Sequence, residues 1–244
     1  MIHLRLLVKM KIKNLITCFY SFGVILIFSY LKEENTNRMT DNLNEFNTYL
    51  ALGDSYTIGE SVLLTESFPY QTVQMLRKEG FDFNAPEIIA KTGWTTDELQ
   101  AAIDTHKFQP PYNFVSLLIG VNNHYRGWSI ENYKPEFERL LEQAISFAGG
   151  KPNHVFVLSI PDWGVTPFAE GRNSQQIAVE IDQYNKANKA IAEKYAVNYV
   201  DITQGSREAL HNKELLASDG LHPSAKEYTR WANKIVESIK MQIR

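Results

Sequence analysis

The fold of this chain follows from the stretch Tyr49-Leu50-Ala51-Leu52-Gly53-Asp54-Ser55-Tyr56-Thr57-Ile58-Gly59-Glu60. Its first four residues are apolar and end at a glycine, which predicts a short buried strand. We expect Gly53-Asp54-Ser55 to form a tight turn that pushes Ser55 outward, because glycine adopts backbone angles that other residues avoid. A serine at the carboxyl end of a buried strand lies where open α/β sheets bind their ligands. The same residues also suit an ordinary turn whose Asp or Ser caps a helix.

Beyond this stretch, apolar strand patterns alternate with helical patterns. We expect strands at 49–52, 87–90, 114–119, 155–160 and 199–202, and helices at 67–78, 95–106, 133–147, 175–196 and 225–243. Five strands that alternate with helices predict an α/β fold, a three-layer α/β/α sandwich whose parallel sheet is covered on both faces. We expect the flavodoxin-like strand order 2-1-3-4-5 with right-handed crossovers. This order places the functional site at the carboxyl edge, around the first strand.

Composition and charge narrow the functional class. The 244 residues are 44% hydrophobic and 22% charged, as is usual for a globular protein with a packed core. Cys18 is the only cysteine, which excludes a disulfide framework and a cysteine-based zinc site. The chain has no glycine-rich phosphate loop. Residues 39–244 carry 19 basic and 26 acidic residues, and this acidic balance argues against a nucleic-acid partner.

The first 46 residues differ from the rest of the chain. Basic residues precede Leu15–Leu31, an uncharged run typical of an export signal or a membrane anchor, and no small-residue cleavage site follows it. We therefore expect a signal or anchor segment at 1–31, a polar linker at 32–46 and the main domain at 47–244. The basic flank favours a membrane-anchored or exported protein whose main domain lies outside the cytoplasm. The alternative is a cytoplasmic protein whose translation starts at Met39.

A second polar cluster lies near the end of the chain, at Ser218-Asp219-Gly220-Leu221-His222-Pro223-Ser224. An aspartate three residues before a histidine can bring both side chains to one side of a tight turn. The carboxylate then holds the Nδ1–H of the imidazole and leaves Nε2 free to accept a proton from a serine. Pro223 favours an extended backbone at His222, which suits a residue presented on a loop before a helix. The alternative is a surface turn whose aspartate caps that helix.

Two further signals follow the second and third strands. Gly120-Val121-Asn122-Asn123 comes directly after the third strand, and the amide of an asparagine is a neutral donor that can stabilise an oxyanion. Gly93, which follows the second strand, would let a backbone N–H come close to a ligand. Each pattern alone also fits an ordinary turn. In a 2-1-3-4-5 sheet, however, both positions converge on Ser55.

In order and spacing, these blocks resemble the SGNH (GDSL-type) hydrolase family of serine esterases and lipases over residues 47–243. The resemblance implies Ser55 as the nucleophile, His222 as the general base and Asp219 as the residue that orients the imidazole. It also implies an oxyanion hole formed by the N–H groups of Ser55 and Gly93 and by the side chain of Asn122. Neither a metal nor a cofactor is expected.

The sequence departs from the family pattern at two positions. Asn123 stands where the family often has an aspartate, which bears on how Asn122 is held, and Tyr56 replaces the commoner leucine. The α/β-hydrolase fold is disfavoured, because it has Gly-x-Ser-x-Gly in mid-chain and an acid far from the histidine.

The resemblance implies hydrolysis of small-molecule carboxylic esters, such as acylated sugars, lysophospholipids or thioesters, through an acyl-enzyme. The alternative is a catalytically silent protein that binds a glycan or a lipid in the same cleft. Trp163 and Phe168 follow the fourth strand, where they would either wall an acyl pocket or pin their own loop. His124 borders the expected site and is interpreted as a packing or solvated residue rather than a catalytic one.

Overall fold

The computed structural model describes residues 46–243, and the chain divides into two units at 1–46 and 47–244. The expected signal or anchor segment at 1–31 and all but the last residue of the linker at 32–46 lie outside the described residues. None of the helices between residues 46 and 243 is both long and apolar enough to cross a membrane.

The sheet has the predicted order. Its five parallel strands are arranged β2-β1-β3-β4-β5, namely β1 (Tyr49–Asp54), β2 (Glu87–Lys91), β3 (Phe114–Leu118), β4 (Val155–Leu158) and β5 (Asn198–Val200). β1, β3 and β4 are buried along their whole length, which explains their nearly continuous apolar sequences. The strand order reverses beside β1, and this reversal opens a crevice at the carboxyl edge of the sheet. The α/β class and the strand order are confirmed.

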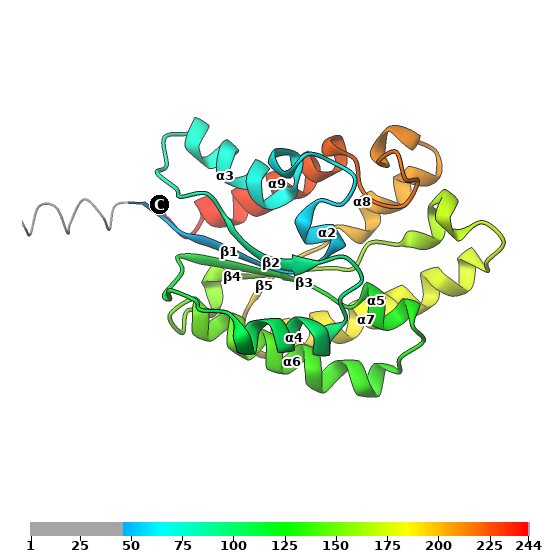
Figure 1. Ribbon diagram of the computed structural model, residues 1–244, viewed down its shortest axis with the longest axis horizontal. Coiled ribbons are helices and arrows are strands. Elements are labelled where there is room, and N and C mark those ends of the chain that lie inside the picture. The colour runs from blue at the N-terminus through cyan, green and yellow to red at the C-terminus, as the bar shows by residue number, and fades with distance from the viewer. Residues whose placement is uncertain (1–45, 244) are drawn as a thin grey trace, which may run out of the picture. The chain divides into compact units, whose positions relative to one another are not determined.

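Helices cover both faces of the sheet, as Figure 1 shows. One layer contains α3 (Phe68–Lys78) and α9 (Ala225–Lys240), which pack against each other through the rings of Phe68, Tyr228 and Trp231. The other layer contains α4 (Thr96–Thr105), α6 (Ile130–Phe147) and α7 (Ser174–Lys194). Three short helices, α2 (Ser55–Ile58), α5 (Val121–Tyr125) and α8 (Thr203–Arg207), follow β1, β3 and β5. These layers form the predicted sandwich.

The structure differs from the sequence prediction at several element ends. α6 begins at Ile130 instead of 133, because the Ser129 side chain caps it by accepting the N–H of Asn132. α2 and α5 stand where turns were expected, since a helix of four or five residues is too short to show an apolar period.

Gly53 is required for space and not for a turn. β1 continues through Asp54, and α2 begins directly afterwards at Ser55. A Cβ on Gly53 would lie 2.1 Å from Thr57 Oγ1 and 2.4 Å from the Leu118 carbonyl oxygen. The expectation of a glycine-based turn was therefore wrong. The missing side chain lets β1, β3 and the first turn of α2 come into close contact.

Candidate active site

Ser55 opens α2 at the carboxyl end of β1. Asp54 caps this helix, because its Oδ1 accepts the N–H of Tyr56 at 3.0 Å. Ser55 is 5% exposed and lies in the lining of a pocket, so the sequence-based picture of an outward-pointing turn residue was wrong. A serine in this position can react only with a molecule that enters the pocket.

His222 lies in the same pocket and is paired with Asp219. The imidazole Nδ1 and Asp219 Oδ2 are 2.5 Å apart, and Asp219 Oδ1 accepts the N–H groups of Leu221 and His222, both at 3.0 Å. The predicted turn therefore brings the carboxylate against the imidazole. With Nδ1–H donated to the carboxylate, Nε2 of His222 is the nitrogen left to accept a proton.

A second serine, Ser61, also holds the Asp219 carboxylate. Ser61 Oγ donates to Asp219 Oδ2 at 2.7 Å, across 158 positions of sequence. Burial opposes ionisation of the Asp219 carboxyl. The hydrogen bonds from His222, Leu221 and Ser61 outweigh burial and hold the Asp219 pKa below its usual range. Ser61 has a φ of 65°, in the left-handed region that few residues other than glycine adopt. Asp219 therefore stays ionised and fixed beside His222.

Tyr56 packs against His222 from within the domain. The two ring centroids are 5.5 Å apart at an interplanar angle of 62°, and the Tyr56 ring also meets Trp231 of α9 edge-on. Tyr56 is 3% exposed. The aromatic residue at this position thus supports the imidazole with a rigid surface that a leucine would not provide.

The loop after β2 brings Gly93 to the pocket. Gly93 has a φ of 85°, and a Cβ there would meet no atom within 4 Å, so the glycine serves the backbone conformation rather than close packing. Arg126 Nη2 donates to the Gly93 carbonyl at 2.7 Å, and the Thr92 hydroxyl donates to the carboxylate of Glu60. The loop is thus held on both sides of the Gly93 N–H.

Asn122 and Asn123 are adjacent but have different surroundings. One N–H of Asn122 Nδ2 donates to the Trp94 carbonyl at 3.0 Å, and the second remains for the pocket that Asn122 lines. Asn123 is fully buried; its Oδ1 accepts the Thr96 N–H at 3.1 Å and its Nδ2 donates to Thr96 Oγ1 at 2.7 Å. Asn123 therefore ties α5 to the start of α4, which holds Asn122 in place.

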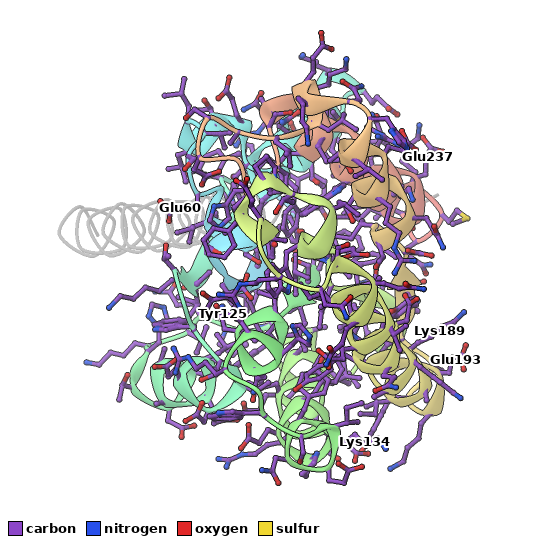
Figure 2. The ribbon with its side chains drawn as sticks, turned by 90° about the vertical axis from the view of Figure 1, so that its right-hand side faces the viewer. Glu60, Tyr125, Lys134, Lys189, Glu193 and Glu237 are labelled. Carbon is purple, nitrogen blue, oxygen red and sulfur yellow. The ribbon has the colours of Figure 1, made fainter. Side chains whose placement is uncertain are left out.

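The pocket has an aromatic wall beside these polar groups. Tyr125, Trp163 and Phe168 line it, and their rings lie within 6.1 Å of one another, centroid to centroid. Figure 2 views the domain from the side of the carboxyl ends of the strands, with Tyr125 labelled. His124 is buried behind this wall, where Trp163 Nε1 donates to its Nδ1. Trp163 and Phe168 are thus part of the pocket and not only of their own loop.

The structure brings Ser55, Gly93, Asn122 and His222 to one pocket, with Asp219 behind the imidazole. Sequence reasoning missed two contributors to this site, the Ser61 hydroxyl on Asp219 and the Arg126 guanidinium on the Gly93 carbonyl. Neither contact leaves a local pattern, because each joins residues that are more than 30 positions apart.

Asp54 is a buried carboxyl directly before Ser55. It has no exposed surface, and this burial raises the Asp54 pKa from 3.8 to about 7. Its Oδ2 has no hydrogen-bond partner among the described residues. Because the pKa of this carboxyl is higher in the folded state than in the unfolded state, its ionisation destabilises the folded state. Stability should therefore fall as the pH rises from about 4 through about 7.

We expect Asp54→Asn to remove this pH dependence, since an amide keeps the acceptor for Tyr56 and carries no charge. The rise of the Asp54 pKa from its ordinary value corresponds to about 4 kcal/mol of unfolding free energy at alkaline pH. Urea unfolding at pH 3, pH 5 and pH 9 should show Asp54→Asn to be similar to the wild type at pH 3, more stable by less than half of the full effect at pH 5, and more stable by the full effect at pH 9. A difference in stability between the two proteins that is the same at all three pH values would contradict this assignment.

Comparison with known proteins addresses the family and the fold of the chain. The chain matches the model of the GDSL-like Lipase/Acylhydrolase family over residues 51–230. No curated protein matches it. Among solved structures, the psychrotrophic esterase EstA from Pseudoalteromonas sp. is 16% identical with a TM-score of 0.63, and the match covers 81% of this chain and 98% of that one.

Two other solved structures are similar to this chain to about the same extent. Axe2, an acetylxylan esterase from Geobacillus stearothermophilus, is 20% identical with a TM-score of 0.61 over 79% of this chain and 94% of that one. The lipase/acylhydrolase from Enterococcus faecalis is 19% identical with a TM-score of 0.63 over 82% and 98%. At these identities the likeness establishes a common fold. The family model covers most of the chain, and the chain belongs to the GDSL-like lipase/acylhydrolase family.

Proposed function

We propose that this protein hydrolyses carboxylic esters through an acyl-enzyme on Ser55. The observation that carries the proposal is the His222–Asp219 pair, 2.5 Å apart, in a pocket that also contains Ser55, Gly93 and Asn122. Family membership supports the same class of reaction, and so do the names of EstA and Axe2, both esterases.

In the first step, His222 Nε2 takes the proton of the Ser55 hydroxyl as Oγ attacks the carbonyl carbon of the ester. The carbonyl oxygen becomes an oxyanion, and the donors for it are the N–H groups of Ser55 and Gly93 and the free N–H of Asn122 Nδ2. His222 then gives its proton to the alcohol oxygen. The C–O bond breaks, the alcohol leaves, and the acyl group stays on Ser55.

In the second step, a water molecule takes the place of the alcohol. His222 removes one proton from the water, which attacks the acyl-enzyme, and the same oxyanion donors act again. The proton passes from Nε2 back to Ser55 Oγ as the carboxylic acid departs. Asp219, which hydrogen bonds keep ionised, stabilises the imidazolium formed in both steps.

The proposed substrate is a small-molecule ester such as an acylated sugar or an acylated lipid. Axe2 is by its name an acetylxylan esterase, which supports an acylated sugar. The apolar side chains of the pocket, among them Val121, Tyr125, Trp163, Phe168 and Leu221, suit an acyl group. The second candidate, a binding protein without catalysis, is favoured only by this apolar lining.

A fluorophosphonate probe separates the two candidates. EstA carries monoethylphosphonate as an inhibitor in its structure, so a phosphorus electrophile is a suitable test for this fold. We expect one covalent adduct, located on Ser55 by fragmentation of the labelled peptide and absent from Ser55→Ala. A protein that hydrolyses no ester and forms no adduct on Ser55 would be the binding protein.

A further inference from the structure

Two cavities lie next to each other at the site and have a common wall. The site pocket has a cavity volume of about 130 Å³, and the second cavity is much smaller, about 20 Å³. Both are lined by Tyr56, Trp163 and Leu221. The other apolar residues around the second cavity are Pro161, Ala209, Leu215, Leu216 and Pro223. The three common residues thus form a partition between two largely apolar spaces.

Hydrogen bonds hold the indole of Trp163 in this partition. The side chain is 4% exposed, and its Nε1–H donates to His124 Nδ1 at 3.2 Å. Because an indole nitrogen can only donate, Nδ1 of His124 accepts, and Nε2 carries the proton donated to Glu180 Oε2 at 2.8 Å. Hydrogen bonds from Gln176 and His124 hold the pKa of Glu180 below its usual range. The carboxylate therefore stays ionised and keeps accepting from His124.

The backbone around Trp163 is fixed as well. Asp162 is 2% exposed and accepts the N–H of Gly164 and Nε of Arg207, both at 2.9 Å. A Cβ on Gly164 would lie 2.9 Å from the side chain of Ile177, so this loop packs directly onto α7. An indole held at its nitrogen and at its backbone cannot move aside without disrupting close packing. Trp163 is therefore a rigid wall of the pocket.

We propose that Trp163 limits the length of the acyl group, so that the substrates are esters of short acyl chains, and that His124 is the positioning residue for its indole. The inference rests on the proposed ester hydrolysis. We place the acyl group, which remains on Ser55 after the alcohol has left, against the buried Trp163 in the lining of the pocket. The alcohol must reach solvent before water attacks and leaves by the open side.

Nitrophenyl esters from acetate through butyrate and octanoate to palmitate test the proposal, because they differ in the acyl chain alone. The wild type should have its highest kcat/KM on short chains. Trp163→Ala joins the two cavities, and each further methylene that enters apolar space raises kcat/KM about fourfold. Octanoate has four more methylenes than butyrate, so the ratio of kcat/KM on octanoate to that on butyrate should rise about 250-fold in Trp163→Ala.

Two further variants show whether the second cavity takes the chain. Leu215→Ala is the matched control, because Leu215 lines only the second cavity and its loss leaves the partition intact. It should keep the octanoate-to-butyrate ratio of the wild type. Ala209→Leu in the Trp163→Ala background fills the second cavity and should lower the ratio again. If Trp163→Ala does not fold, Leu221→Ala opens the same partition from the loop that carries His222.

His124→Phe tests the positioning role. It keeps a flat ring behind Trp163 and removes the acceptor for the indole N–H. The octanoate-to-butyrate ratio of kcat/KM should therefore rise, but by a smaller factor than in Trp163→Ala. A merely structural role would lower kcat/KM on all esters alike and leave the ratio unchanged.

The possible failures can be told apart. A wild-type protein that hydrolyses no ester and takes no fluorophosphonate on Ser55 would overturn the proposed function and this inference together. Ester hydrolysis with the same octanoate-to-butyrate ratio in the wild type and in the opened variants would overturn the inference alone. The same holds for a wild type that prefers palmitate.

Discussion

Ser55→Ala is expected to lower kcat for ester hydrolysis by about 10⁴–10⁶-fold, because the variant has no oxygen to form the acyl-enzyme. The substitution should lower kcat and leave the thermal stability of the protein unchanged. Alanine fits the first position of α2, and the cap from Asp54 to Tyr56 does not involve the Ser55 side chain. Initial rates on a short-chain ester, together with a thermal melt of each protein, measure both effects. A variant that keeps more than a few per cent of activity would rule out Ser55 as the nucleophile.

His222→Ala should cost about as much as Ser55→Ala, and the double variant should be no worse than either single one. When two residues act as one catalytic unit, the losses of activity from their substitutions do not add, because removing the base already leaves the serine inactive. This comparison separates a catalytic pair from two residues that merely shape the pocket. Losses that multiply in the double variant would show that the two side chains act independently.

Asn122→Ala should lower kcat about 10²–10³-fold with little change in KM. The carbonyl oxygen acquires negative charge only as the tetrahedral intermediate forms, so the amide hydrogen bond strengthens in the transition state. The N–H groups of Ser55 and Gly93 would remain, which should leave measurable activity. Steady-state kinetics on the same ester as for Ser55→Ala give the comparison.

Asn123→Ala is the matched control for Asn122→Ala. Its side chain faces Thr96 and not the pocket, and its loss leaves the buried N–H of Thr96 without a partner, whereas Thr96 Oγ1 keeps its hydrogen bond to the Glu136 carboxylate. Such an unpaired group costs about 1–3 kcal/mol of folding free energy, so this variant should lose thermal stability. Its kcat should fall far less than that of Asn122→Ala. If both variants showed the same small losses of activity and stability, Asn122 would be a structural residue and not an oxyanion donor.

Much of the fold could be predicted from the sequence, because each buried strand is a separate apolar run that ends at a turn residue. The parallel order followed from alternation with helices. The pocket residues Ser55, Gly93, Asn122 and His222 could be found because each lies at a strand end or just before a helix, where the fold gathers its loops.

What the sequence did not indicate depends on contacts between distant residues. Ser61 reaches Asp219 across 158 positions, and its left-handed backbone leaves no pattern in the neighbouring residues. Arg126 meets the Gly93 carbonyl only because α5 lies beside the loop after β2. Gly53 looked like a turn residue because a close approach to Thr57 and Leu118 cannot be read from one strand.

The packing of α9 against α3 has a consequence for the time at which activity can arise. His222 and Asp219 lie directly before α9, and Gln71 of α3 joins the two helices by donating to the Ala225 carbonyl at 2.9 Å and accepting from Thr229 at 2.6 Å. If Ser55 and His222 act together as proposed, a nascent chain whose α9 has not yet been synthesised contains Ser55 without its general base. On the proposed mechanism, ester hydrolysis can begin only after α9 has been synthesised and has packed against α3.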